Sequence, residues 1–177
     1  MVETNDRKLP VGIQSFEEIR KQGCLYVDKT DIIWQLANKG KTYNYLIRPR
    51  RFGKSVLVDT LESYFLGKKE LFAGLKIMQL ETEWVKRPVI RLDMSRAGAE
   101  PETLRSYLDN AFRQYEKEYS LTPNPTDSLA DRFNAIIVGS YEQTGHQVAI
   151  LIDEYDSPLQ HSWKTPHHEA CTSIYRE

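Results

Sequence analysis

The spacing of apolar side chains along the chain predicts an alternation of strands and helices. Apolar positions recur every three or four residues in five segments, which is the helical period. These are residues 15–23, 30–40, 54–67, 101–119 and 128–142. Three short runs are instead continuously apolar or rich in β-branched and aromatic side chains, which is typical of strands. These are residues 43–47, 89–93 and 147–152. The pattern favours an α/β fold, a three-layer arrangement with a parallel sheet between helices.

Several helix ends carry their own signals. Ser15 is followed three residues later by Glu18, which predicts a capping box at the first helix. Pro101 suits the first turn of the fourth helix, and Gly145 suits the end of the fifth. We therefore expect these helices to begin and end close to those residues.

The segment 43–58 predicts a strand, a basic loop and a helix opened by Gly53, Lys54 and Ser55. In such a unit, loop amides and the helix N-terminus surround a phosphate group. The phosphate-loop pattern G-x-x-x-x-G-K-S/T requires a first glycine at position 48, where this chain has Arg48, and Pro49 removes one amide donor. On its own this imperfect match leaves a chance occurrence in a surface loop open.

The predicted nucleotide-binding residues are those of the loop and the first helical turn. They are Arg50, Arg51, Phe52, Gly53, Lys54, Ser55 and Val56. Lys54 would contact the β- and γ-phosphates of ATP, and the Ser55 hydroxyl would bind Mg²⁺. The arginines have a simpler interpretation as general anion attraction at the loop.

The run 147–154 is apolar and ends on Asp153 and Glu154. It predicts a parallel strand that is buried on both faces and delivers its two acids to a ligand crevice. Asp153 would hold Mg²⁺, and Glu154 would orient and deprotonate the attacking water. The alternative is a core strand followed by a solvated acidic turn, since Asp-Ser-Pro at 156–158 favours a turn.

Other polar residues have weaker functional interpretations. Asp28 and Lys29 either contact a nucleotide or form a helix cap and its solvated neighbour, and the cap is favoured. Asp93 either reaches the crevice or caps the next turn. A zinc site near the end of the chain has low prior weight, because the spacing of its histidines and cysteine fits no recognised pattern. Those residues are His161, His167, His168 and Cys171.

Composition narrows the class of protein. The 177 residues are 40% hydrophobic and 28% charged with a formal net charge of −1, as expected for one globular domain and not for a dedicated nucleic-acid binder. No run of 18 apolar residues predicts a membrane span, and the polar start predicts no secretory signal. Two widely separated cysteines, Cys24 and Cys171, favour a reducing cytoplasm.

Four blocks in order resemble the predicted AAA-ATPase-like family of bacterial proteins. They are Leu9-Pro10-Val11-Gly12, Tyr26-Val27-Asp28-Lys29-Thr30, residues 48–55 and residues 151–156. The resemblance implies that Arg48 is the family's own form of the loop. It also implies that a nuclease-like domain of the PD-(D/E)XK type usually follows. We therefore expect an N-terminal helical extension at 1–42, a P-loop ATPase-like domain at 43–177 truncated after the acidic strand, and nucleic acid as an indirect partner only.

Two functions remain open from the sequence. The first is Mg²⁺-dependent ATP hydrolysis with Lys54 and Glu154 as catalytic residues, coupled to a conformational change. The second is a nucleotide-gated binding or regulatory module with negligible turnover, which serves an absent nuclease-like domain. The resemblance also implies a further strand between the runs 43–47 and 148–152, and residues 158–177 contain no apolar run for it. We expect self-association or a partner to fill that gap, and both weak nucleotide binding and weak turnover by the chain alone.

Overall fold

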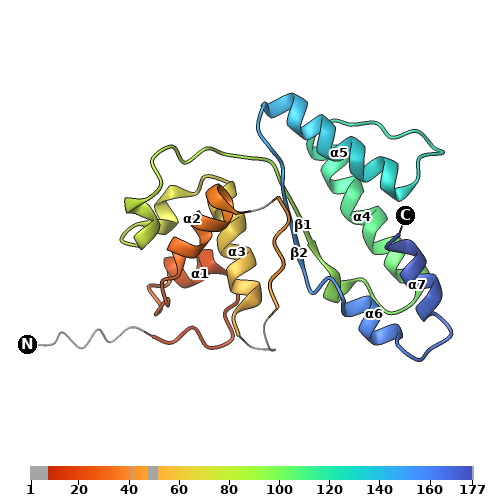
Figure 1. Cartoon of the computed structure of the whole chain (residues 1–177), viewed down its shortest axis with the longest axis horizontal. Coiled ribbons are helices and arrows are strands. Elements are labelled where there is room, and N and C mark those ends of the chain that lie inside the picture. Colours follow the sequence, from red (N-terminus) through yellow and green to blue (C-terminus); the bar gives the residue numbers. More distant parts are fainter. Residues whose placement is uncertain (1–7, 41, 48–51, 177) are drawn as a thin grey trace, which may run out of the picture. The chain divides into compact units, whose positions relative to one another are not determined.

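The computed structural model describes residues 8–40, 42–47 and 52–176, which form two compact units (Figure 1). The first unit is Met1–Lys86 and the second is Arg87–Glu177. This division falls inside the predicted domain 43–177, and the boundary at residue 42 stays a prediction. In the described residues the chain is an α/β protein with seven α-helices and a two-stranded parallel sheet. None of the described helices is long and apolar enough to cross a bilayer.

The first unit consists of helices around an aromatic core. Its elements are α1 (Phe16–Lys21), α2 (Thr30–Lys39), α3 (Lys54–Phe65) and the 3-10 helices η1 (Lys69–Phe72) and η2 (Lys76–Gln79). The core consists of buried Phe16, Ile33, Tyr64, Leu71, Phe72, Leu75 and Ile77. The predicted cap of α1 is confirmed in part, since the Ser15 hydroxyl accepts the Glu18 amide and no return bond from the Glu18 side chain is described.

The predicted strand at 43–47 is wrong. Residues 44–47 have no regular secondary structure, and Tyr43 and Ile47 are 91% and 79% exposed. A strand is stable only beside another strand, and the described part of this unit contains helices and loops alone. The β-rich composition of the run predicted local extension but could not supply a neighbour.

The second unit packs helices on one face of the sheet. The sheet pairs β1 (Val89–Asp93) with β2 (Ala149–Asp153) in parallel, so both predicted strands are confirmed. The helices are α4 (Pro101–Glu118), α5 (Leu129–Thr144), α6 (Ser157–Ser162), α7 (His168–Ile174) and the 3-10 helix η3 (Met94–Arg96). Pro101 opens α4 and Gly145 ends α5 with φ 70°, as the sequence predicts. Ser128 and Asp131 form a capping box at the start of α5, which the sequence analysis does not identify.

Two tyrosine hydroxyls of α4 cover the outer edge of β1. Ala149 donates its amide to the Pro88 carbonyl, so alternate residues of β1 face β2 and the intervening ones face away. On that far edge the Tyr115 hydroxyl accepts the Arg91 amide at 2.7 Å and donates to the Arg91 carbonyl at 3.1 Å. The Tyr107 hydroxyl accepts the Asp93 amide at 2.8 Å. A helix thus satisfies edge groups that would otherwise need another strand.

The expectation that the acidic strand is buried on both faces is wrong for β2. Ile90 and Leu92 of β1 are 0% and 4% exposed in the core beneath α4 and α5. Their register partners Ile150 and Ile152 are 40% and 45% exposed. The helices cover this face of the sheet at β1. At β2 the same face is only partly covered by the described residues.

A buried ion cluster joins α4 to α5. The Arg132 guanidinium binds Glu116 through Nε at 2.6 Å and Nη2 at 2.9 Å, and it binds Asp109 through Nη1 at 2.5 Å. Glu116 is 6% exposed, and the guanidinium also lies 6.0 Å from the centre of the Phe112 ring. The pairing with Glu116 and Asp109 raises the pKa of Arg132, so the guanidinium stays positively charged over the whole pH range in which the protein is folded.

Asp109 gives this cluster a pH dependence. Its hydrogen bond to Arg132, with the charge of Arg113, lowers the pKa of Asp109 below the ordinary 3.8. A lowered folded-state pKa stabilises the protein above pH 3.8, and this stabilisation is lost as the pH falls through the folded-state value. We expect Asp109→Asn to lower the urea concentration at the midpoint of unfolding at pH 7. The difference between the midpoints of wild type and variant should become smaller below pH 3.8. A gap that stays constant with pH would contradict this assignment.

Candidate functional site

The first half of the candidate site is the start of α3. Gly53 precedes the helix with φ 71° and ψ 25°, a left-handed conformation that glycine adopts without the steric cost of a side chain. Lys54 and Ser55 occupy the first turn, where amides have no partner within the helix. Val56 follows and is partly buried, whereas Phe52 is 63% exposed.

Not all of the predicted loop can be located. Arg50 and Arg51, like Arg48 and Pro49, lie outside the described residues. The start of α3 is of the kind that binds phosphate, because the first amides of a helix and the positive end of its dipole both favour an anion at that end.

Contacts farther along α3 fix this helix to its own unit. Asp59 accepts the Phe16 amide at 2.6 Å and the Ser15 hydroxyl at 3.3 Å, which joins α3 to the start of α1. The Thr60 hydroxyl donates to the Val56 carbonyl and lies 3.4 Å from the Tyr26 hydroxyl. The helix that begins at Lys54 is therefore held in its unit by the hydrogen bonds of Asp59 and Thr60, one turn farther along.

The second half of the candidate site is the carboxyl end of the sheet. Asp153 is the register partner of Asp93, so two aspartates end adjacent parallel strands. Asp153 is 7% exposed, and its Oδ1 accepts the Glu154 amide at 3.0 Å. Glu154 has φ 49°, an uncommon conformation for a residue with a side chain. Such strained residues cluster at functional sites.

The two halves belong to different compact units. Gly53–Val56 lie in Met1–Lys86, whereas Asp153 and Glu154 lie in Arg87–Glu177. The structure brings the two acids together at one strand end and the glycine, lysine and serine together at one helix end. The assignment of both halves to one nucleotide stays a prediction.

Two of the weaker assignments have structural roles instead. Asp28 accepts the amide and hydroxyl of Thr30 at 2.9 and 2.7 Å and the Lys76 amide at 2.8 Å, so it binds the first residues of α2 and η2, whose cap positions are occupied by Lys29 and Leu75. Asp93 accepts the Ser95 amide at 3.1 Å and the Ser95 hydroxyl at 2.6 Å, which caps η3. The capping interpretation is therefore confirmed for Asp93, whereas Asp28 stabilises the start of α2 from one residue before the cap.

Three residues of the proposed zinc site have other hydrogen-bond partners. His161 Nδ1 lies 2.7 Å from the Ser157 carbonyl oxygen, and His168 Nδ1 lies 3.2 Å from the Ser162 hydroxyl. Cys171 is buried and donates to the Ala99 carbonyl. The described residues contain no group of three or more His, Cys, Asp or Glu placed to hold a metal ion.

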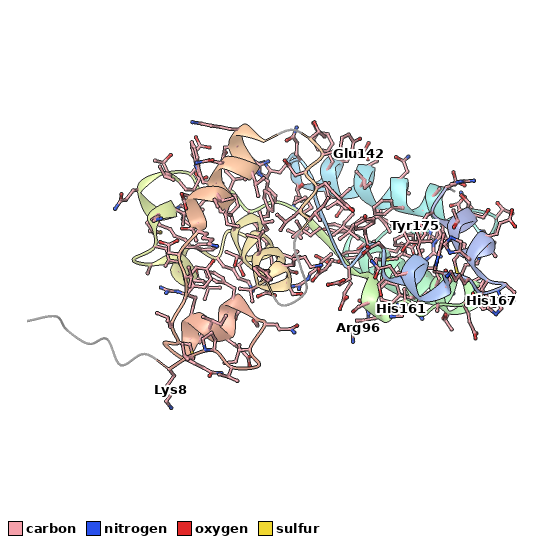
Figure 2. All side chains as sticks on the ribbon, turned by 60° about the horizontal axis from the view of Figure 1, so that its bottom comes forward. Lys8, Arg96, Glu142, His161, His167 and Tyr175 are labelled. Atoms are coloured by element: carbon pink, nitrogen blue, oxygen red, sulfur yellow. The ribbon has the colours of Figure 1, made fainter. Side chains whose placement is uncertain are left out.

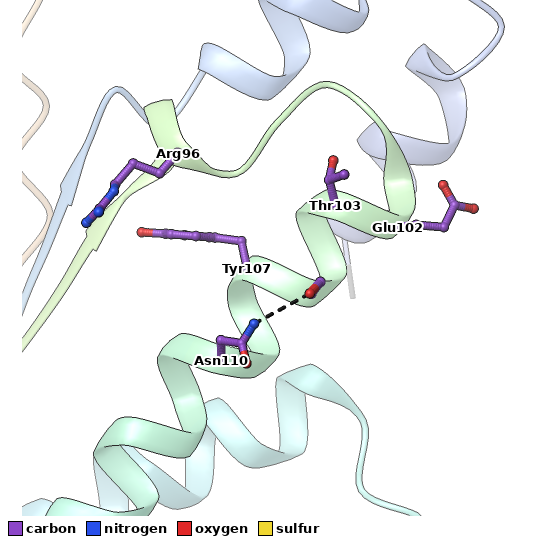
Figure 3. A pocket seen from close by; sticks show the side chains of 6 residues that line it. Arg96, Glu102, Thr103, Tyr107 and Asn110 are labelled. Carbon is purple, nitrogen blue, oxygen red and sulfur yellow. Dashed lines mark hydrogen bonds between the residues drawn. The ribbon is translucent and has the colours of Figure 1, made fainter.

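The linings of two open grooves contain none of the predicted site residues. One, of about 390 Å³, runs along the first turns of α4 and is shown in Figure 3, where Arg96 lies beside the Tyr107 ring and Asn110 donates to Ser106. The other, of about 590 Å³, includes Trp34 and Lys39 of α2. Neither groove is lined by the first turn of α3 or by the acids after β2, so groove volume does not mark the candidate site.

Comparison with known proteins identifies the family. The sequence model of the family described as "Predicted AAA-ATPase" matches residues 10–177. The chain belongs to this predicted AAA-ATPase family. A further match is an uncharacterized protein in the vnfD 5'region of Azotobacter chroococcum mcd 1, which is 35% identical over 156 residues. The match covers 86% of this chain and 30% of that protein, and no solved structure matches significantly.

The donors present in this predicted AAA-ATPase suit a hard cation. Mg²⁺ binds oxygen ligands and usually keeps several waters beside one or two protein carboxylates or substrate phosphates. Asp153 offers a carboxylate whose Oδ2 accepts no hydrogen bond from the described residues, and Ser55 offers a hydroxyl at the start of α3. The residue types therefore fit a nucleotide-bound Mg²⁺.

Proposed function

We propose that this chain is an ATP-binding P-loop module that hydrolyses ATP with Mg²⁺. The observation that carries the proposal is the family match, because it spans both Gly53–Ser55 and Asp153–Glu154 in a single model. The left-handed Gly53 before α3 and the left-handed Glu154 after β2 are consistent with it, although Trp84, Ser120 and Lys164 also have positive φ.

Each residue would have one role. The amides from Arg50 to Ser55 would surround the phosphates, and the Lys54 ammonium would neutralise the β- and γ-phosphate oxygens. Ser55 and Asp153 would hold Mg²⁺, which supplies charge neutralisation when it is bound. Glu154 would accept a proton from water as the water oxygen bonds to the γ-phosphorus and the bond to the bridging oxygen breaks, giving ADP and phosphate.

A nucleotide-gated module without turnover is the second candidate function. Its support is that the two halves lie in separate compact units, so the start of α3 would suffice to bind the nucleotide, whereas turnover would need residues of both units. Both functions share ATP binding and differ in phosphate release.

The deciding experiment uses Glu154→Gln. This substitution keeps the shape of the side chain and removes its basicity, so we expect ATP binding to persist and single-turnover phosphate release to fall at least tenfold. Glu169→Gln on α7 is the matched control and should leave both unchanged. ATP binding without phosphate release by the wild type would select the second function, and equal release by both proteins would exclude Glu154 as the base.

A further inference from the structure

The turn after β2 is held by a side chain from much farther along the chain. Tyr175, directly after α7, donates its hydroxyl to the Tyr155 carbonyl at 2.7 Å. The two residues are 20 positions apart and belong to the same compact unit, and Figure 2 labels Tyr175. The Tyr155 carbonyl follows Glu154 by one residue, so this bond acts on the backbone that carries the predicted base.

The backbone at Glu154 requires such support. A left-handed conformation is sterically unfavourable for a residue with a side chain, and φ is 49° here. Two bonds within the turn help to hold it, from the Ser157 amide to the Glu154 carbonyl at 2.8 Å and from the Glu154 amide to Asp153. Both of these bonds join residues of the turn itself, so they do not fix its position. The Tyr175 bond instead connects the turn to the end of α7.

That other element is anchored in the core. Cys171 and Ile174 of α7 are 0% and 7% exposed, and they pack in the same cluster as Leu104 and Ile136. The Tyr175 hydroxyl is protonated at neutral pH, and desolvation, with contributions from Asp156 and Cys171, raises its pKa to about 12 although the residue is 38% exposed. Tyr175 therefore offers a hydrogen-bond donor directly after a helix that is packed in the core.

We propose that Tyr175 is a positioning residue for Glu154: its bond to the Tyr155 carbonyl fixes the turn, and thereby the direction of the Glu154 carboxylate toward the attacking water. This inference rests on the proposed function, because it names what controls the base. Tyr175 itself touches neither nucleotide nor water in this role.

The test compares Tyr175→Phe with Thr172→Val in the full chain. Each removes one hydroxyl from the end of α7, but Thr172 donates within the helix to the His168 carbonyl. For Tyr175→Phe we expect single-turnover phosphate release to fall at least fivefold with the ATP dissociation constant within twofold of wild type. We also expect amide exchange of Ser157 to accelerate at least tenfold, while exchange of Ala149, which bonds to Pro88, is unchanged. Thr172→Val should alter none of these.

The outcomes separate this inference from the proposed function. Unchanged Ser157 exchange in Tyr175→Phe overturns the positioning role, and so does faster exchange with normal phosphate release. A parallel loss of ATP binding and release indicates general structural damage and also overturns it. If the wild-type protein binds ATP but releases no phosphate, the proposed hydrolysis is wrong. The positioning role of Tyr175 is then wrong as well, because Glu154 has no reaction to catalyse.

Discussion

Lys54→Ala should abolish measurable ATP binding. A lysine in the first turn of α3 would form charge-assisted hydrogen bonds to phosphate oxygens, and their loss costs about 1.5–3 kcal/mol, which corresponds to roughly ten- to hundredfold in affinity. Because wild-type affinity is itself expected to be weak, such a loss places the variant beyond the range of a titration. Fluorescence titration with a labelled ATP analogue and Mg²⁺ measures the effect.

Lys117→Ala on α4 is the control for Lys54→Ala. It removes the same charge from an exposed helical position in the other compact unit, and it should leave ATP affinity unchanged. Far-ultraviolet circular dichroism of both variants checks that the helices are retained. Equal binding by wild type and Lys54→Ala would show that the start of α3 is not a phosphate site.

Arg132→Ala should destabilise the second unit by about 3–5 kcal/mol. Removal of the guanidinium leaves the Glu116 carboxylate buried without its cation, and an unpaired buried charge costs far more than a lost surface pair. Urea unfolding followed by circular dichroism measures the change, and a loss of this size is a large part of the stability of an ordinary domain.

Arg113→Ala is the matched control for Arg132→Ala. Arg113 pairs with the same Asp109, but its side chain is 70% exposed, so its removal should cost no more than about 0.5 kcal/mol. If the two alanine variants unfold at the same urea concentration, the Arg132 cluster is not a buried ion network.

Local sequence signals predicted most of the second unit. Ser128 with Asp131, Pro101 and Gly145 set helix ends through bonds and dihedral angles within a few residues, so they can be read without tertiary structure. The strands at 89–93 and 149–153 were predicted because short apolar runs followed by acids and turn residues are typical of strand ends. The run at 43–47 is also rich in strand-forming side chains, but it forms no strand. A strand needs a neighbouring strand to pair with, and composition does not reveal whether one is present.

The long-range roles could not be predicted. Arg132 gave no signal in the sequence, because its partners Asp109 and Glu116 lie 23 and 16 residues away. Tyr115 lies within the helical segment predicted at 101–119, and nothing in the sequence indicates that its hydroxyl binds the amide and carbonyl of Arg91 at the edge of β1. The contact of Tyr175 with Tyr155 likewise spans 20 residues and depends on how α7 packs. For the candidate site, the sequence identified residue types and their order, and the structure added the backbone strain at Glu154.

The tyrosine contacts on β1 also imply an order of folding. β1 and α4 are joined by Tyr107 and Tyr115 within a contiguous stretch of about 30 residues, whereas β2 lies beyond α5. Short loops close at lower entropic cost than long ones, so the strand and its helix can assemble before the second strand arrives. β2, with its terminal acids, then joins a scaffold that is already formed. The turn after β2 should therefore become ordered later than β1 and α4 during refolding.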